Sequence, residues 1–373
     1  MHGKSTLGAG NYSEPGLYLI NPEMVQYQLK LRLSGKQERT LLEWLPILGS
    51  VFNFGLRKIE LNARNHIYFS SNDFQNLLAG HGPKLGIPSH TLQGVLSTVY
   101  ISWQRCFKKL ARKPRLKGKR RPLNSIPFPD PIKPPSDGKI GLPGLGKVRF
   151  HKQELPAGKI KCGRICKRAS GWYLCLFIDA EPKPVPRVAE GRIGIDPGFK
   201  DLLTLSTGEK IAPPKEFRAI EKRLGQAQRG NRRKLVARLQ ERAKNRRKDR
   251  NHKLSRRLLG ENITICFLQD NHRAIAKTFG KSVAESGHGQ LRQQLSYKSL
   301  PGGTELLFPD NRNSTKTCST CGGLTGPSGL SGLAVREWKC GHCGAHHDRD
   351  INSAKNALIS GAGCAHEKAY ACA

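Results

Sequence analysis

Two spacing patterns divide the first half of the chain into strands and helices. Apolar and polar residues alternate from Val25 to Leu33, as in a strand with one buried face, and apolar residues recur at helical spacing from Gln37 to Ile59. Pro122 to Pro135 is rich in proline and is expected to be extended or loop-like. The same patterns predict helices at Phe74 to Leu78 and Ser89 to Leu110, and strands at Lys147 to Phe150, Gly158 to Cys166 and Trp172 to Ile178.

In the second half, short apolar runs alternate with helical segments, which is typical of an α/β domain. A proline-rich linker, Glu181 to Arg187, precedes this part and predicts a domain boundary near residue 190. Buried strands are predicted at Arg192 to Asp196, Leu202 to Ser206, Ile263 to Leu268 and Glu305 to Phe308. Helices are predicted at 215–257 (one or two long basic helices), at Val283 to Leu300, and from about Asp350 onward.

The charge balance indicates a polyanionic partner. The 373 residues include 64 Lys+Arg and 28 Asp+Glu, a formal net charge of +36. Such a surplus destabilises a compact protein by self-repulsion unless an anion neutralises it, and nucleic acid is the obvious polyanion. An apolar content of 37% supports packed cores and excludes a wholly disordered chain. A generic basic protein, such as a ribosomal one, is the plainer alternative.

No segment has the composition of a membrane span or a secretory signal, so we expect no membrane partner. The most apolar stretch, Leu41 to Leu56, is interrupted by polar residues and a proline, whereas a spanning helix needs about 20 apolar residues. The first residues contain no apolar core segment, and 1–23 is interpreted as a loose tail.

Four of the eleven cysteines form two CxxC pairs, which predicts a metal site in a reducing compartment rather than a disulfide framework. The pairs are Cys318 with Cys321 and Cys340 with Cys343, and eighteen residues lie between the inner cysteines. Four thiolates complete a tetrahedral shell around a structural zinc ion and leave no position open for catalysis. A histidine is the alternative source of one ligand, from among His342, His346 and His347.

Two aspartates occupy positions from which a carboxylate could reach a catalytic metal ion. Asp196 ends an apolar strand, and Asp350 lies at the predicted start of the last helix. Hydrolysis of a phosphodiester with two Mg²⁺ ions needs several carboxylates from separate elements. Each aspartate also has a purely structural interpretation, because Asp before Pro-Gly is common in turns and Asp at a helix start is a common cap.

Taken in order, these motifs resemble the TnpB family, the RNA-guided nucleases encoded by insertion-sequence transposons, and their relatives the compact type V CRISPR effectors. The order is a GIDPG strand, a basic helical segment, an apolar strand, a helix ending in LSYKS, the STKTCSTCG knuckle, a second CxxC and DRDINSAKNAL. In the first half, VQYQLKLRL, the helix with FNFGL, ISWQRCF and LPGLGKVRF resemble that family's wedge and recognition domains. The resemblance covers roughly residues 24 to 360.

The resemblance implies an α+β multidomain protein. It implies a β-barrel-like wedge domain over 24–190, with a helical recognition insert at about 36–122. An RNase H-like (RuvC) α/β nuclease domain would span 191–317 and 345–360, with a zinc-ribbon knuckle inserted at 318–344 and tails at 1–23 and 361–373.

The family's nuclease site combines an Asp on the first strand, a Glu at the end of a later strand and an Asp in a DRDxNxAxN segment. Asp196 and Asp350 match the first and the last, but Gln269 stands where the glutamate is expected. A glutamine carbonyl can contact a metal ion but carries no charge, so the electrostatic clamp on the reacting oxygens weakens.

Four explanations for Gln269 stay open, and with them the question whether the chain is an enzyme. The chain is a naturally nuclease-dead RNA-guided DNA binder, or it carries a Glu→Gln change that traps substrate. Otherwise a carboxylate from elsewhere substitutes, with Asp310 as the best-placed candidate, or Asp270 takes the role through a one-residue shift.

The resemblance also implies the partners. A guide RNA would pair with one strand of a double-stranded DNA target beside a short flanking motif, with Zn²⁺ for structure and Mg²⁺ for any catalysis, in a cytoplasmic, prokaryotic monomer or homodimer. The basic runs can neutralise several phosphates each. The residues expected to bind nucleic acid are Lys108, Lys109, Arg112, Arg115, Arg229, Arg232, Arg233, Arg246 and Arg247.

Two interpretations without catalysis remain beside the nuclease. One is a zinc-containing, DNA-binding repressor that blocks transcription by occupying its target. The other is a basic RNA-binding protein with a zinc ribbon and no DNA target.

Overall fold

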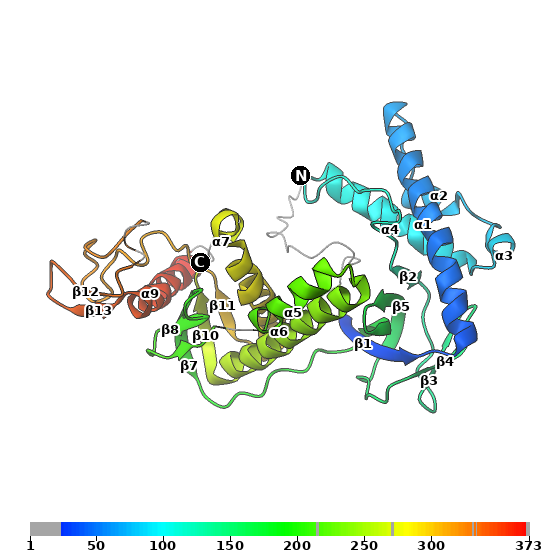
Figure 1. Ribbon diagram of the computed structural model, residues 1–373. Helices are drawn as coiled ribbons and strands as arrows, with labels where there is room; N and C mark the ends of the chain where they lie inside the picture. The colour runs from blue at the N-terminus through cyan, green and yellow to red at the C-terminus, as the bar shows by residue number, and fades with distance from the viewer. Residues whose placement is uncertain (1–23, 214–215, 270–271, 330–331, 333, 371–373) are drawn as a thin grey trace. The chain divides into compact units, whose positions relative to one another are not determined.

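The computed structural model describes residues 24–370 except 214–215, 270–271, 330–331 and 333, and it divides into two compact units between Pro182 and Lys183 (Figure 1). The sequence placed a boundary near residue 190. The residues between these two positions belong with the second unit, because Val185 packs on its core and the Val188 N–H donates to the Gly260 carbonyl at 2.7 Å.

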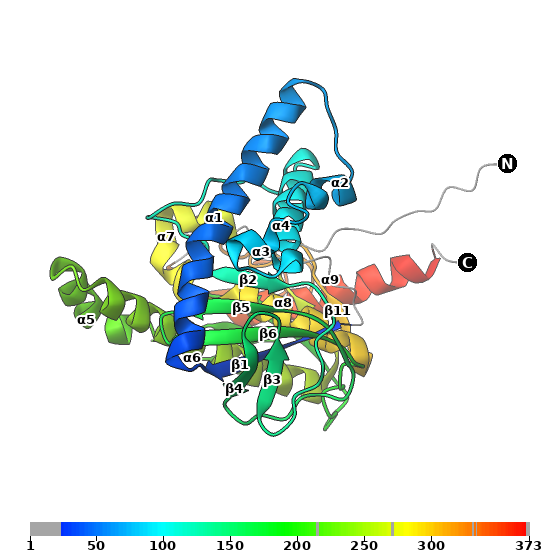
Figure 2. The same ribbon diagram turned by 90° about the vertical axis from the view of Figure 1, so that its right-hand side faces the viewer.

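The first unit contains a six-stranded antiparallel sheet in the order β2-β5-β6-β1-β4-β3 (Figure 2). β1 changes partner along its length: Met24 to Lys30 pair with β6, and Leu31 and Arg32 pair with β4. Among the described residues, the edge strands β2 and β3 do not pair with each other, so the sheet does not close into a barrel. The strands are β1 (Met24–Arg32), β2 (Ser125–Phe128), β3 (Lys139–Leu142), β4 (Gly146–Phe150), β5 (Lys159–Arg168) and β6 (Gly171–Asp179).

Four helices complete the first unit: α1 (Gly35–Arg64), α2 (Ser71–Asn76), α3 (Gly82–Leu85) and α4 (Ser89–Phe107). A capping box starts α1, since the Gln37 N–H donates to Ser34 Oγ at 3.3 Å and the Ser34 N–H donates to Gln37 Oε1 at 3.1 Å. The same Gln37 side chain donates to the Leu145 and Lys147 carbonyls, which ties the start of α1 to the β3–β4 hairpin. Buried leucines of α1 and α4 share one core with the sheet.

The second unit is built on a mixed five-stranded sheet in the order β11-β10-β7-β8-β9. β11, β10 and β7 run parallel, whereas β7, β8 and β9 run antiparallel. The strands are β7 (Gly191–Pro197), β8 (Leu203–Leu205), β9 (Lys210–Ile211), β10 (Asn262–Phe267) and β11 (Glu305–Leu307).

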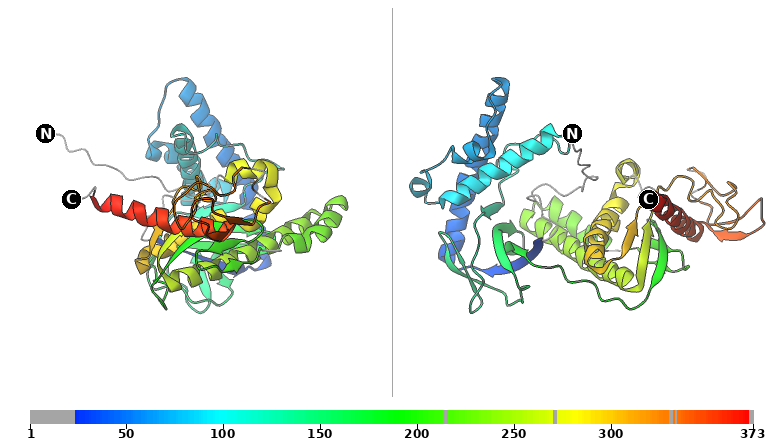
Figure 3. Two further views of the ribbon diagram at one scale, coloured as in Figure 1. Left: turned by 90° about the vertical axis from the view of Figure 1, so that its left-hand side faces the viewer. Right: turned by 180° about the vertical axis from the view of Figure 1, so that it is seen from behind.

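Helices cover both faces of this sheet. On one face, leucines of α6 and α8 pack on Ile193, Ile195, Ile265 and Phe267; on the other, Ala357 of α9 packs on Cys266. α9 also lies beside the small β12–β13 hairpin (Figure 3). The elements are α5 (Arg218–Arg229), α6 (Arg233–Glu261), α7 (His272–Ser286), α8 (His288–Ser299), the 3-10 turn η1 (Leu300–Gly302), β12 (Glu337–Lys339), β13 (His346–Asp348) and α9 (Arg349–Tyr370).

Two expectations from the sequence are corrected here. The helix expected from Val283 to Leu300 is broken at Gly287, whose φ of 67° belongs to the left-handed region. A Cβ at this position would lie 2.7 Å from Arg247 Cδ, so glycine both permits the break and lets α6 approach it. Residues 361–370, expected as a tail, continue α9. Among the described helices, none combines the length and the apolarity of a membrane crossing.

Candidate functional site

The carboxyl ends of the parallel strands bring two of the three predicted catalytic positions, Asp196 and Gln269, to one edge of the second sheet. Asp196 lies near the end of β7, in register with Leu268 because Ile195 pairs with Phe267 of β10. Gln269 pairs with Asp310 in an isolated parallel bridge just beyond β10 and β11. Ligands of open α/β sheets bind at this kind of edge, beyond the carboxyl ends of the strands.

Asp196 and Asp350 lie on the same face of this sheet. A Cβ built at Gly194 would overlap the carbonyl oxygen of Ala354, so the backbone of α9 packs directly on the face that Gly194 presents. Asp196 is two residues further along β7 and therefore shares that face. Asp350 lies one turn before Ala354 in α9. The glycine of the Gly194-Ile195-Asp196 run thus permits the close helix approach that brings the two carboxylates to one side.

Two cations meet the acidic groups at the start of α9. Asp348 caps the helix, because its Oδ1 accepts from the N–H groups of Asp350 and Ile351 at 3.0 Å each. Its Oδ2 pairs with Lys210 Nζ at 2.6 Å, and this hydrogen bond raises the pKa of Lys210. Asp350 Oδ2 pairs with Arg336 Nη1 at 3.1 Å, and only 17% of the Asp350 side chain is exposed. Sequence reasoning missed both cations, since neither lies in a recognisable motif.

The side chain of Gln269 is bound to the neighbouring strand. Its Nε2 donates to the Phe308 carbonyl at 2.7 Å, and its backbone N–H donates to the Pro309 carbonyl at 3.2 Å. These contacts direct it toward β11, whereas Asp196 lies on β7, on the other side of β10. A glutamate could not make the same contact, because a carboxylate has no proton to donate to a carbonyl.

The structure adds no support for either carboxylate that could replace the expected glutamate at the third catalytic position. Asp310 is exposed, and its Oδ2 pairs with Arg312 Nε at 2.7 Å while its Oδ1 accepts from the Arg312 N–H at 3.1 Å. The hydrogen bond from the Arg312 side chain is the main cause that lowers the pKa of Asp310. Its carboxylate is thus engaged within its own turn. Asp270 lies outside the described residues.

The donor set at this edge suits one divalent ion better than two. Mg²⁺ takes oxygen ligands and is commonly held by one or two carboxylates, with water and phosphate oxygens completing its shell. Asp196 and Asp350 are two such carboxylates, and an ion bound to Asp350 would compete with Arg336. A two-metal arrangement needs more negative charge than these two groups carry, and Gln269 adds none.

The four cysteines of the two CxxC pairs converge as the spacing predicted. Their sulfurs all lie within 4.8 Å of one another, and they form the one cluster of at least three potential metal ligands found in the described part of the chain. Cys318 and Cys343 are 3.8 Å apart at sulfur, and Cys321 and Cys340 are 3.7 Å apart. A tetrahedral zinc ion with Zn–S bonds of about 2.3 Å separates its sulfurs by about 3.8 Å. The cluster therefore has the dimensions of a four-thiolate zinc site.

One of the nearby histidines contacts this cluster. His347 Nε2 lies 3.0 Å from Cys318 Sγ, and its ring centroid is 4.8 Å from that of Trp338. The four sulfurs already form a complete shell, so His347 is a hydrogen-bonding neighbour rather than a needed ligand.

Two asparagines of the DRDxNxAxN segment, to which the sequence assigned no role, join α9 to the segment that carries the first CxxC pair. Asn352 Oδ1 accepts from the Ser319 N–H at 2.8 Å, and its Nδ2 donates to the Thr317 carbonyl at 2.8 Å. Asn356 Nδ2 donates to the Thr317 carbonyl at 2.7 Å and to the Ser314 carbonyl at 2.8 Å. Their spacing of four residues, which puts both on one helix face, was the available signal.

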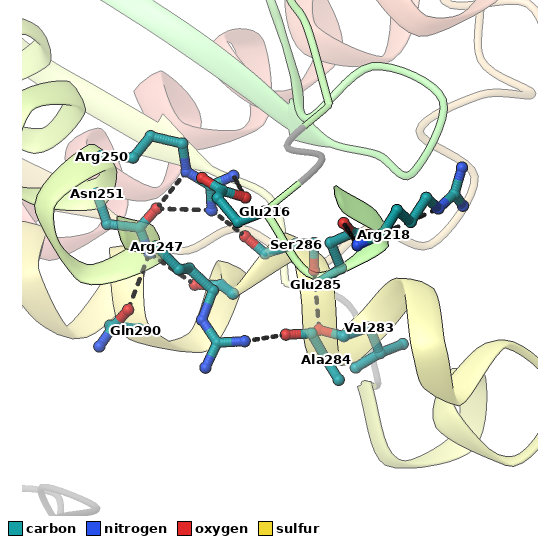
Figure 4. Close-up of polar contacts among 11 residues, drawn as sticks. Glu216, Arg218, Arg247, Arg250, Asn251, Val283, Ala284, Glu285, Ser286 and Gln290 are labelled. Carbon is teal, nitrogen blue, oxygen red and sulfur yellow. Dashed lines mark hydrogen bonds and ion pairs between the residues drawn. The ribbon is translucent and has the colours of Figure 1, made fainter. Parts of the chain in front are cut away.

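Eight of the nine residues expected to bind nucleic acid are exposed, and one is partly engaged inside the protein. Arg247 is half-buried, and its Nη1 donates to the Ala284 carbonyl (Figure 4). Its neighbour Arg250 donates to the Ser286 carbonyl at 2.8 Å and pairs with Glu216. Both guanidinium groups thus bind carbonyls at the end of α7, where helix carbonyls lack partners. The exposed eight are Lys108, Lys109, Arg112, Arg115, Arg229, Arg232, Arg233 and Arg246.

Comparisons with known proteins add independent findings. The family model described as "Cas12f1-like, TNB domain" matches residues 288–357, and the one described as "Probable transposase" matches residues 177–267. A Streptomyces pristinaespiralis protein, whose name describes an RNA-guided DNA endonuclease, is 33% identical over 297 residues, covering 74% of this chain and 72% of that protein.

A more distant relative carries a similar name. InsQ of Escherichia coli, also named for RNA-guided DNA endonuclease activity, is 25% identical over 305 residues, covering 74% of this chain and 75% of that protein. A solved Cas12f1 complex with guide RNA and target DNA aligns over 90% of this chain and 98% of that chain, at 17% identity and a TM-score of 0.35.

Proposed function

The chain belongs to the TnpB family of RNA-guided DNA endonucleases, and on that premise we propose that it binds a guide RNA and uses it to hold a matching DNA duplex. Base pairing between guide and target carries the sequence specificity, and the protein reads a short flanking motif and the backbone of the heteroduplex. We further propose that its RuvC-like site cuts slowly, because position 269 carries an amide where a negative charge is needed.

The observation that carries the RNA-guided part is the 33% identity to a relative named as an RNA-guided DNA endonuclease. The charge distribution supports it. The net charge of +36 requires polyanionic partners, and the exposed arginines and lysines of both units supply phosphate contacts.

The proposal for slow cleavage rests on how the sheet edge is arranged. Asp196 and Asp350 would hold Mg²⁺, which supplies a Lewis acid for the scissile phosphate when bound. Lys210 holds the Asp348 cap, and the cap fixes the start of the helix that carries Asp350. Gln269 contributes no charge and directs its amide to Phe308, so the attacking and leaving oxygens receive less stabilisation than three carboxylates would give.

The RNA-guided part is tested by the RNA that accompanies the protein. We expect the full chain to copurify with one defined, structured RNA, identified by sequencing. Reloading the protein with that RNA carrying either of two guide segments should then direct it to the matching one of two duplexes in a gel-shift assay. Absence of a defined RNA, or equal binding of both duplexes with either guide, would contradict the proposal.

A repressor that occupies its target without cutting is the second candidate, and the hydrogen bond from Gln269 to Phe308 favours it. This candidate predicts a guide-dependent fall in reporter transcription with the target plasmid intact. If Asp310 instead completes the site, the wild-type protein cuts rapidly and Asp310→Asn abolishes cutting. Asp249→Asn is the matched control, because Asp249 is also an exposed aspartate paired with a nearby cation, Lys253, but lies on α6.

A further inference from the structure

A cationic pocket lies in the first unit, outside the residues that the two family models match. Its volume is about 290 Å³, and it lies between α4, the segment 111–117, and strands β2 and β5. Five cationic side chains and no carboxylate are among its lining residues in the described chain. The cations are Arg105, Arg112, Arg115, Lys117 and Arg164.

Asn53 of α1 holds the backbone of this pocket at Lys117. The Lys117 N–H donates to Asn53 Oδ1 at 2.7 Å, and Asn53 Nδ2 donates to the Lys117 carbonyl at 3.0 Å. Lys117 Nζ lies 4.6 Å from the ring centroid of Phe52, within cation–π range. On the opposite wall, Arg164 donates to Ser125 Oγ at 3.5 Å and to Thr98 Oγ1 at 3.4 Å. Lys117 and Arg164 are therefore positioned by the fold.

None of the residues that line the pocket in the described chain is a carboxylate, so its walls carry a net positive charge. Burial lowers the pKa of Lys117, and the nearby positive charge of Arg121 lowers it further. Glu60, the carboxylate that meets this basic segment, pairs with Lys113 at 3.1 Å instead. Placing cations together in a recess costs free energy that a bound anion recovers.

The shape of the pocket favours a phosphate of an unpaired nucleotide over the phosphates of a duplex. Phosphates of a duplex lie on the outside of a rigid helix and can meet only exposed side chains at the rim, such as Lys108. A recess of this volume, near the lower end for small-molecule sites, accepts one nucleotide that has left a helix. Its apolar surface, with Ile101 and Leu123, suits a base or sugar, and hydroxyl and amide groups at Ser102 and Asn124 can meet sugar hydroxyls.

We propose that this pocket binds one unpaired nucleotide of an RNA, with its phosphate among Lys117, Arg105 and Arg164 and its nucleoside against Ile101 and Leu123. The assignment of the nucleotide to RNA rests on the proposed function, in which a folded guide RNA supplies unpaired residues at loops and ends. The 2′-hydroxyl distinguishes it from DNA at such a site.

The test compares Lys117→Met with Lys119→Met in the full chain. Both variants lose one positive charge from the same segment, but Lys119 is exposed and does not line the pocket. Binding of a fluorescent, single-stranded RNA decamer without guide sequence is measured by anisotropy over a range of salt concentrations. We expect Lys117→Met to weaken binding about tenfold and Lys119→Met by less than about threefold, because a phosphate in the recess is less screened than one at the rim.

A DNA decamer of the same sequence tests whether the pocket prefers ribose to deoxyribose. The proposal expects Lys117→Met to weaken RNA binding several-fold more than DNA binding. Equal losses of RNA affinity in the two lysine variants would overturn the proposed nucleotide site. Equal losses of affinity for RNA and DNA in Lys117→Met would overturn its assignment to RNA. If Lys117→Met lowers the thermal midpoint, the comparison is repeated with Arg115→Gln and Arg120→Gln. Both arginines are exposed, but only Arg115 lines the pocket. Because the decamer carries no guide, the result stands apart from whether guided DNA binding occurs.

Discussion

At the scale of single residues, two small differences decide what the sheet edge can do. An amide at position 269 donates a hydrogen bond to Phe308, which a carboxylate cannot do. A glycine at position 194 lets α9 approach β7 at backbone distance, which any side chain would prevent. The first changes the charge of the edge, and the second brings Asp350 to the face of Asp196.

Gly194→Ala tests the close helix approach. The added Cβ would overlap the Ala354 carbonyl and lie 2.9 Å from the Leu358 N, so α9 must move away from β7. We expect the free energy of unfolding to fall by about 1–3 kcal/mol, as for overpacked cores. Gly289→Ala is the matched control, because its Cβ meets nothing within 4 Å in α8, and it should gain about 0.5–1 kcal/mol. Urea unfolding of both variants measures the difference, and a Gly194→Ala as stable as wild type would refute the packing argument.

The sequence suggested candidate residues for the site, but it did not predict the contacts that they make. The cysteines follow from their spacing, whereas Asp196, Gln269 and Asp350 were assigned as a set through the family resemblance. The pairing of Lys210 with Asp348 joins residues that are 138 positions apart, and no local pattern encodes such a contact. For the same reason, only the structure shows the hydrogen bond from the Gln269 side chain to the Phe308 carbonyl.

At the scale of elements, the start of α9 links the zinc-binding segment to the sheet. Asp348 caps the helix from the end of β13, and Asn352 and Asn356 bind carbonyls around Cys318. Elements with clear periodicity, such as α1, α4, β5 and β6, were predicted near their observed bounds, whereas α3, β3, β9, β12 and β13 are too short to show one. The helix break at Gly287 was missed because a single glycine is tolerated within a helical pattern.

Asp348 can be varied to separate its cap from its ion pair. Asp348→Ala removes both, and we expect a loss of about 1 kcal/mol in unfolding free energy from the cap. Asp348→Asn keeps an oxygen for the Asp350 and Ile351 N–H groups and loses only the contact with Lys210, a partly exposed pair worth less than about 1 kcal/mol. Equal losses in thermal unfolding would show that the ion pair, rather than the cap, holds the helix start.

Zinc removal should loosen α9 as well as the knuckle. A strong chelator is expected to release one zinc ion per chain and to speed hydrogen exchange over residues 314–325 and 340–352, since Asn352 and Asn356 lose ordered partners. Cys321→Ser should lower the measured zinc content, whereas Cys162→Ser, outside the cluster, should not. Unchanged zinc content in Cys321→Ser, or unchanged exchange in α9 after chelation, would contradict the account.

At the scale of the whole molecule, the proposed function separates nucleic-acid binding from catalysis. In that proposal, the exposed basic residues of both units bind nucleic acid without using the sheet edge, where acidic side chains face Lys210 and Arg336. Composition alone indicated a polyanion, and only the ordered motifs identified RNA-guided DNA recognition. Because the proposed function assigns binding and cutting to different residues, a change at position 269 should alter cutting and leave binding intact.

The most direct test of this account is single-turnover cleavage of a guide-matched duplex by wild type and Gln269→Glu, at saturating protein and Mg²⁺, with binding measured in parallel. Glutamate adds the missing charge and cannot keep the hydrogen bond to Phe308, so its carboxylate is free for a metal ion. We predict equal dissociation constants and cleavage at least about 100-fold faster in Gln269→Glu, the size of a lost electrostatic contact in a transition state. Equal cleavage rates in the two proteins would contradict it.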